Sequence, residues 1–285
     1  MLSSTQLSII LALSISYAFV SAQSVANSTA TAPTPTTGAG GLTAGLSPGC
    51  QAAAGGLLST EFSSCANIIG LVSLISAQGG LIDPLSNWIS GVCSASPCSS
   101  ATLSTTSTSL NAGCGADIQK GVPSAIALNT VITNYNPIRE MICTQYSTNS
   151  TFCATSILSN IQTATGKSIT LNEVQAVVSG GLNALPLSSV PASAYCNDCG
   201  HALFTKSKAI NVNTGSSNLT SASSGASDAA AQTCGASFND GKVPSTVRVA
   251  GSTKAGAPNA GGKNKASVVN AVAMGLMALV AICIV

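Results

Sequence analysis

The cysteines constrain the fold of this chain more than any other feature. The sequence contains 11 cysteines in 285 residues, and all but the last fall between residues 50 and 234. These are Cys50, Cys65, Cys93, Cys98, Cys114, Cys143, Cys153, Cys196, Cys199 and Cys234. An even set in an oxidising compartment predicts disulfides, each of which stabilises a fold by about 2–4 kcal/mol. We therefore expect five bridges of undetermined connectivity, since spacing does not fix the pairing.

The N-terminal residues have the pattern of a secretory signal peptide. An uncharged apolar run extends from Leu7 to Val20, and small residues precede a cleavage point ahead of Gln23. The run is too short to cross a bilayer comfortably. A buried N-terminal helix is the alternative interpretation, but the sequence favours a signal peptide over residues 1–22 that directs the chain to export.

The eleventh cysteine, Cys283, lies in an apolar C-terminal segment. Residues 268–285 carry no charge and follow a polar spacer that contains Lys263 and Lys265. Small residues, a polar spacer and an apolar tail are typical of the signal for a glycosylphosphatidylinositol (GPI) anchor, whose attachment removes the tail. A retained membrane span is the alternative, but both lysines would then stand on the lumenal side, against the positive-inside rule.

The small residues before the spacer include the expected attachment point of the anchor. We expect attachment at Asn259, with Gly256, Ala260 and Gly261 as neighbouring alternatives. The chain then divides into a signal peptide, a Thr/Pro/Gly-rich spacer, a Cys-rich helical domain, a flexible stem and a GPI-attachment propeptide. Their ranges are 1–22, 23–45, 46–245, 246–259 and 260–285.

The low charge content excludes several functions. Only 6% of the residues are charged, and loss of Lys263 and Lys265 with the tail leaves eight basic residues (10 − 2) against 8 acidic ones. Without a basic cluster the chain has nothing to neutralise a run of phosphates, so we expect no nucleic-acid partner. Solubility must come from hydroxyl groups and from glycans. Acceptor sequons begin at Asn27, Asn149 and Asn218.

The Cys196–Cys199 pair resembles a metal or redox motif only superficially. A haem signature needs His directly after the second cysteine, but Gly200 intervenes before His201. Zinc needs further ligands, and His201 is the single histidine. A redox dithiol normally lies at a helix N-terminus that follows a strand, and the sequence shows no such pattern around Cys196 and Cys199. The sequence thus favours structural disulfide cysteines over a redox or metal site, and a solvated helix position for His201.

Apolar spacing predicts helices throughout the domain. Asp83 and Pro84 are expected to begin a helix, with Asp83 as its cap. Its inner face carries apolar residues at i, i+3, i+4 and i+7, namely Leu85, Trp88, Ile89 and Val92. A capping box over residues 170–173, with Ile169 and Val174 as a staple, predicts a helix that stops at Gly180–Gly181. Residues 68–75 are apolar all round and are expected to form a central buried helix.

A further helix is expected to begin at Asn136–Pro137, with Ile138, Met141 and Ile142 on its inner face. The inner face of the next helix is expected to carry Cys153, Ile157, Leu158 and Ile161. Strand-like alternation is scarce. The sequence therefore predicts an all-α, disulfide-stapled bundle of about seven to nine short helices with low-complexity flanks.

Seven short motifs resemble those of a known family. They are Leu46–Cys50, Ser63–Cys65, Leu85–Trp88 before Cys93, Pro97–Ser99, Tyr135–Cys143, Cys196–Cys199 and Cys234–Gly241. Their order is similar to that of a basidiomycete family of secreted, GPI-anchored surface proteins with a domain of unknown function, over residues 46–245. The resemblance implies a fungal cell-surface location, and it implies no activity, cofactor or catalytic residue.

Catalysis would need a paired acid and base, and the chain offers few. The candidates are Glu61, Asp83, Asp117, Glu140, Glu173, Asp198, Asp228, Asp240 and His201. Most are expected to serve as caps or ion-pair partners. We therefore expect a non-enzymatic cell-surface or cell-wall protein without a cofactor, bound to the outer leaflet through its anchor or to wall polysaccharide. The alternative is a binder of a sterol or fatty acid in a helical cavity.

Overall fold

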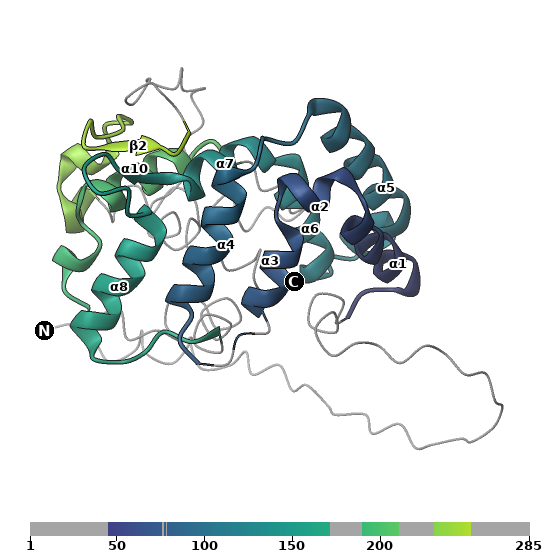
Figure 1. The fold of residues 1–285 in the computed structure, drawn as a ribbon, viewed down its shortest axis with the longest axis horizontal. Coiled ribbons are helices and arrows are strands. Elements are labelled where there is room, and N and C mark those ends of the chain that lie inside the picture. Colours follow the sequence, from purple (N-terminus) through teal and green to yellow (C-terminus); the bar gives the residue numbers. More distant parts are fainter. Residues whose placement is uncertain (1–44, 76, 78, 172–189, 211–230, 252–285) are drawn as a thin grey trace, which may run out of the picture. The chain divides into compact units, whose positions relative to one another are not determined.

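A computed structural model of the chain describes residues 45–75, 77, 79–171, 190–210 and 231–251. Helices dominate this part of the chain (Figure 1). They are α1 (Pro48–Gly56), α2 (Glu61–Cys65), α3 (Ile68–Ile75), α4 (Ile82–Ser94), α5 (Ser100–Gln119), α6 (Pro123–Thr133), α7 (Tyr135–Ile142), α8 (Cys153–Thr165) and α10 (Asp198–Ser207). The predicted disulfide-bonded, all-α fold is confirmed, although α5 with 20 residues is not short.

Local sequence explains where several of these helices begin and end. Ser47 caps α1 by accepting the N–H of Cys50, and a proline occupies the first turn. Ser99 caps α5 by accepting the N–H of Thr102 at 3.0 Å. Asn197 caps α10 in the same way, and α8 ends at Gly166, whose φ of 66° suits glycine.

One group of buried residues, here called the N-terminal cluster, joins α1, α2, α5 and α6. It includes the 3-10 turn η1 (Leu57–Ser59), and its members are Leu46, Cys50, Leu57, Phe62, Cys65, Ala66, Cys98, Leu110, Cys114, Ala125, Ile132 and Tyr135. Within it, α1 and α5 approach closely. A Cβ on Gly113 would lie 2.8 Å from the carbonyl oxygen of Gly49, so this crossing requires glycine.

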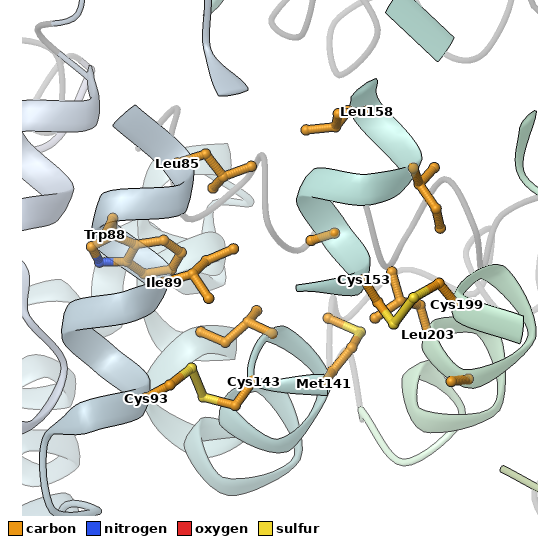
Figure 2. Packing of buried hydrophobic residues seen from close by; sticks show 14 of the residues in the cluster. Leu85, Trp88, Ile89, Cys93, Met141, Cys143, Cys153, Leu158, Cys199 and Leu203 are labelled. Atoms are coloured by element: carbon orange, nitrogen blue, oxygen red, sulfur yellow. A yellow bond between two sulfur atoms is a disulfide. The ribbon is translucent and has the colours of Figure 1, made fainter. Parts of the chain in front are cut away.

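A second group, the central cluster, joins α3, α4, α7, α8 and α10 (Figure 2). The predicted faces of three helices meet here, because the buried members include Leu85, Trp88, Ile89 and Val92 of α4, Ile138, Met141 and Ile142 of α7, and Cys153, Ile157, Leu158 and Ile161 of α8. Ile89, Met141 and Ile157 are fully buried. Apolar spacing at helical period thus identified the core-facing side of each of these helices.

A short sheet corrects the expected end of the domain. Strand β1 (Thr144–Tyr146) pairs antiparallel with β2 (Val247–Val249), and Val247 is 0% exposed in the central cluster. The ordered fold therefore extends past residue 245, into the range expected to be a flexible stem. Strands of 3 residues are too short to show the alternation by which a sheet is recognised in a sequence.

Two helix predictions need correction. Helix α4 starts before Asp83, because the carbonyl of Leu81 already accepts the N–H of Leu85 at 3.0 Å; Leu81 occupies the cap position and Asp83 lies in the first turn. Helix α3 is not buried all round, since Ile69 is 71% exposed while Leu71 and Leu74 are buried. Its contacts with α2, η1 and α4 leave Ile69 facing solvent. The predicted capping-box helix lies outside the described residues from residue 172 onward, up to its expected end at Gly180–Gly181.

Candidate functional site

All ten cysteines of the domain are paired. The bridges are Cys50–Cys114, Cys65–Cys98, Cys93–Cys143, Cys153–Cys199 and Cys196–Cys234. The structure thus agrees with the expectation of five disulfides. Cys196 and Cys199 are not bonded to each other: Cys199 fastens α10 to α8, whereas Cys196 fastens the start of α10 to residue 234. The motif therefore holds two structural bridges in place of one redox dithiol.

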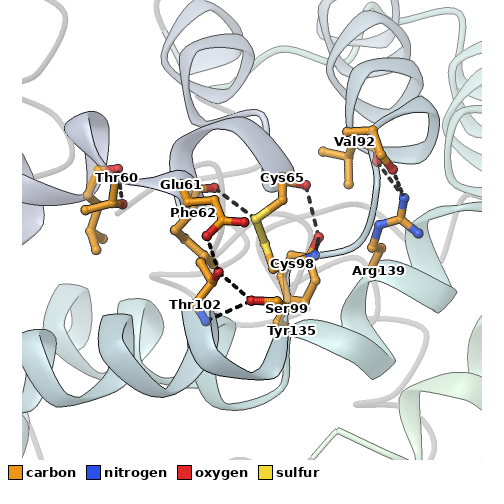
Figure 3. The surroundings of a disulfide bond; sticks show 12 residues. Thr60, Glu61, Phe62, Cys65, Val92, Cys98, Ser99, Thr102, Tyr135 and Arg139 are labelled. Atoms are coloured by element: carbon orange, nitrogen blue, oxygen red, sulfur yellow. Dashed lines mark hydrogen bonds between the residues drawn. A yellow bond between two sulfur atoms is a disulfide. The ribbon is translucent and has the colours of Figure 1, made fainter.

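A tyrosine hydroxyl connects both ends of the Cys65–Cys98 bridge (Figure 3). The hydroxyl of Tyr135 donates to the carbonyl of Cys65 at 3.0 Å and accepts the N–H of Cys98 at 3.3 Å. The ring of Phe62 contacts that of Tyr135 edge-on, with centroids 6.0 Å apart. Both polar groups beside the buried sulfurs are thereby hydrogen-bonded, as burial requires.

Glu61, one of the catalytic candidates, is held beside the same bridge (Figure 3). Its Oε2 accepts the hydroxyl proton of Thr102 at 2.7 Å, and the hydroxyl oxygens of Thr102 and Ser99 lie 2.7 Å apart. Because Ser99 and Thr102 form the first turn of α5, this carboxylate lies at a helix N-terminus, where negative charge is stabilised. Glu61 thus joins α2 to α5.

The neighbouring charged residues Arg139 and Glu140 make contacts across the bundle. Nη2 of Arg139 donates to the carbonyls of Val92 and Ala95 at the C-terminal end of α4. Glu140 accepts from Nζ of Lys206 on α10 at 3.3 Å. Lys206 is buried, with only 8% of its side chain exposed, whereas Glu140 is 51% exposed. This pair joins α7 to α10.

We expect Glu140→Gln to lower the free energy of unfolding by about 1–3 kcal/mol, because it leaves the buried Lys206 charge without its acidic partner. The double variant Glu140→Gln/Lys206→Met should recover most of the loss, since an apolar chain of similar length replaces the buried charge. Urea unfolding at neutral pH measures both. A double variant no more stable than Glu140→Gln alone would contradict the proposed cause.

Asp117 anchors the start of the described domain to α5. Its carboxylate is buried, with the residue 4% exposed, and its Oδ2 accepts the N–H of Ser47 at 2.8 Å. Hydrogen bonds from the backbone and side chain of Ser47 hold the pKa of Asp117 below its ordinary value of 3.8. The ionised form is therefore favoured in the folded state, and Asp117 is a structural anchor for α1.

This lowered pKa predicts a component of acid unfolding. Its stabilising contribution is fully present above the unfolded-state pKa of 3.8 and is lost as the pH falls through the lower folded-state value. Asp117→Asn keeps an oxygen acceptor for Ser47 but cannot titrate, so its stability should fall less steeply below about pH 4. Urea titrations at several acidic pH values test this. The matched control is Asp83→Asn at an exposed position of α4, and an unchanged acid slope in Asp117→Asn would refute the assignment.

His201 is not a solvated residue, contrary to expectation. Its side chain is 13% exposed, its ring stacks on that of Phe238 with centroids 5.0 Å apart, and its Nε2 lies 3.2 Å from Oδ1 of Asp240. A hydrogen bond from the N–H of Lys242, and to a lesser extent the charge of His201, hold the pKa of Asp240 below its usual range. The burial arises because the turn η5 (Ala236–Asn239) folds back over α10.

This histidine–carboxylate pair is the nearest approach to catalytic chemistry in the described part of the chain. Within it, no hydroxyl or thiol hydrogen-bonds the His201 ring. Phe238 also stacks on Phe204 at 6.1 Å, and Lys208 donates to Asn239 at 2.7 Å. The arrangement fastens the segment after Cys234 to α10. A sequence separation of 39 residues gave no local signal of the contact between His201 and Asp240.

The remaining acidic candidates do not converge with this pair on a metal site. Asp198 accepts the hydroxyl proton of Thr246 at 2.6 Å, and Asp83 is exposed. Glu173 and Asp228 lie outside the described residues. Among the residues that the structure describes, no group of three or more His, Cys, Asp and Glu side chains is placed to hold a metal ion.

An apolar notch of about 30 Å³ lies where the two clusters meet. It is lined by residues that include Trp88, Val92, Tyr135, Ile138 and Arg139. Ligand pockets for molecules of drug size typically measure about 300–1,000 Å³. This notch is therefore too small for the sterol or fatty acid of the alternative hypothesis.

None of the helices in the described ranges has the length and hydropathy that a membrane-spanning helix requires.

Of the predicted modification sites, the structure places only one. Asn149 lies exposed in the turn between β1 and α8. Asn27, Asn218 and the predicted anchor residue Asn259 lie outside the described residues.

Comparison with known proteins gives one family. Residues 47–243 match the family described as "Domain of unknown function (DUF7729)". Neither the curated proteins nor the solved structures gave a match. The matched range contains all ten paired cysteines and stops before β2.

Proposed function

Since the chain belongs to the DUF7729 family, whose function is unknown, we propose a function from its own chemistry. The protein is a non-enzymatic cell-surface or cell-wall protein. It is exported, loses both apolar ends and is held at the outer leaflet by a GPI anchor at Asn259, or is transferred from there to wall polysaccharide. The resemblance to basidiomycete surface proteins supports a fungal origin.

The pairing of the cysteines carries this proposal. The domain uses all ten of its cysteines in disulfides, and the eleventh, Cys283, falls in the apolar tail that anchoring would remove. Disulfides persist in extracellular and secretory compartments and are reduced in the cytosol. A chain with this many bridges therefore fits an exported protein, and removal of the tail would leave no unpaired thiol.

The contacts of the ionisable groups support a structural role for the domain. Glu61, Asp117, Glu140 and Asp198 each join two elements of the fold through a hydrogen bond or ion pair. His201 and Asp240 hold one another beneath a stacked phenylalanine. Groups engaged in this way hold segments together and are not displayed for reaction with a substrate.

Expression of the full chain in a fungal host tests the proposal. We expect the protein at the cell surface, its release by phosphatidylinositol-specific phospholipase C, and a mature C-terminus near Asn259 by mass spectrometry. A chain truncated after Ser267 lacks the apolar tail and should be secreted to the medium, which makes it the matched control. A mature protein that retains Val285, or that contains free thiols after export, would overturn the proposal.

A further inference from the structure

The turn between β1 and α8 presents an asparagine side chain to solvent. Residues 147–151 are all exposed. Oδ1 of Asn149 accepts the backbone N–H of Thr151 at 3.0 Å. Within the described residues, Nδ2 of Asn149 donates to no protein group. The amide nitrogen is therefore open to a reagent, while the amide oxygen is held by the residue two positions ahead.

The backbone around Asn149 is fixed by hydrogen bonds on both sides. The N–H of Tyr146 donates to the carbonyl of Thr151 at 2.9 Å, and the N–H of Ser150 donates to the carbonyl of Tyr146 at 3.1 Å. Ser150 adopts a φ of 57° at the tip, and its hydroxyl accepts from Nη2 of Arg248 at 3.2 Å. The turn is thus fixed by hydrogen bonds within its own backbone and to Arg248 of β2, and Asn149 remains exposed to solvent.

Disulfides hold the two ends of this segment. Cys143 precedes β1 and is bonded to Cys93, and Cys153 begins α8 and is bonded to Cys199. Both cysteines are fully buried. The short segment between them therefore runs from the core to the surface and back, and a group attached at its exposed tip would displace no core side chain.

We propose that Asn149 carries an N-linked glycan. This inference rests on the proposed export, because the transfer takes place in the secretory pathway. Nδ2 of Asn149 forms a bond to the anomeric carbon of an oligosaccharide carried by a polyprenyl diphosphate. The bond from that carbon to the diphosphate breaks, the diphosphate leaves with the electron pair, and Nδ2 loses a proton. The backbone N–H of Thr151 already hydrogen-bonds Oδ1, which leaves the hydroxyl of Thr151 as the sequon group that the transferring enzyme recognises.

The low charge content of the chain indicates what the glycan would contribute, namely hydration of the surface. Only 6% of the residues are charged, so few groups keep the surface hydrated. A glycan at Asn149 would cover the β1–α8 turn with hydroxyl groups. It would also shield the nearby edge of the sheet, where Arg248 of β2 contacts the same turn.

Peptide mapping of the full chain from a eukaryotic secretory host tests this inference. Peptide N-glycosidase F removes the glycan and converts a glycosylated Asn to Asp, which marks the site. We expect this conversion at Asn149 in the wild-type protein and in Thr151→Ser, which keeps the hydroxyl of the sequon. Thr151→Ala should abolish it while leaving Asn149 in place. Thr151 uses only backbone groups in its contacts, so the variant should fold.

The outcomes separate this inference from the proposed function. An exported protein in which Asn149 is unmodified would overturn the glycan and leave the proposed export intact. A chain retained in the cytosol would overturn both. Modification that persists in Thr151→Ala would show that the sequon is not the feature that is recognised, and would also overturn the assignment.

Discussion

Gly200→Ala is expected to lower the free energy of unfolding by about 3–5 kcal/mol, one of the two largest effects that we predict for a single site or bridge. A Cβ on Gly200 would lie 1.8 Å from the carbonyl oxygen of Tyr195 and 3.0 Å from its carbonyl carbon. These are backbone atoms directly before Cys196, whose bridge to Cys234 restrains them. The first turn of α10 would therefore have to move away from Tyr195. Urea unfolding of the purified protein measures the loss.

Gly115→Ala is the matched control, because Gly115 is also helical but has no atom within 4 Å of its ideal Cβ. This variant should be as stable as the wild type or up to about 1 kcal/mol more stable, since alanine favours a helix over glycine. If both variants unfold like the wild type, the close approach of α10 to Tyr195 is absent in solution. If both are equally destabilised, the effect does not come from this contact.

The helical faces of the central cluster could be predicted from the sequence because their signal is local. Leu85, Trp88 and Ile89 recur at helical spacing, and any partner that covers one of them covers the others. The same holds for α7 and α8. Residues 68–75 gave no such signal, because a run that is apolar all round does not show which side has a partner. Only the packing of α2, η1 and α4 against α3 shows that Ile69 faces solvent.

The contacts that sequence reasoning missed join residues far apart in the chain. His201 and Asp240 are 39 residues apart, and Thr144 pairs with Val249 across more than a hundred residues. Neither contact leaves a periodic pattern. The pairing of the cysteines could not be predicted either, because a disulfide forms between cysteines that the fold brings close together, whatever their separation in the sequence. The number of cysteines predicted how many bridges to expect, and the packing of helices decided which formed.

Removal of the Cys50–Cys114 bridge by Cys50→Ala/Cys114→Ala should lower the free energy of unfolding by about 4–6 kcal/mol. Restriction of the unfolded chain accounts for about 3–4 kcal/mol, because the bridged residues are 64 apart but Cys65–Cys98 shortens the free loop between them. The remainder comes from packing. Both cysteines are fully buried in the N-terminal cluster, and the close crossing of α1 and α5 would lose the two sulfurs at its centre.

Cys196→Ala/Cys234→Ala separates these two contributions. This bridge spans 38 residues, so its effect on the unfolded chain is similar, since that effect grows only with the logarithm of loop length. Its cysteines are only half-buried, however, so little packing is lost. We expect this variant to lose about 1–2 kcal/mol less than the buried pair in the same urea titration. Equal losses would assign the whole effect to chain entropy, and a buried-pair variant as stable as the wild type would show that α1 and α5 are held together without their disulfide.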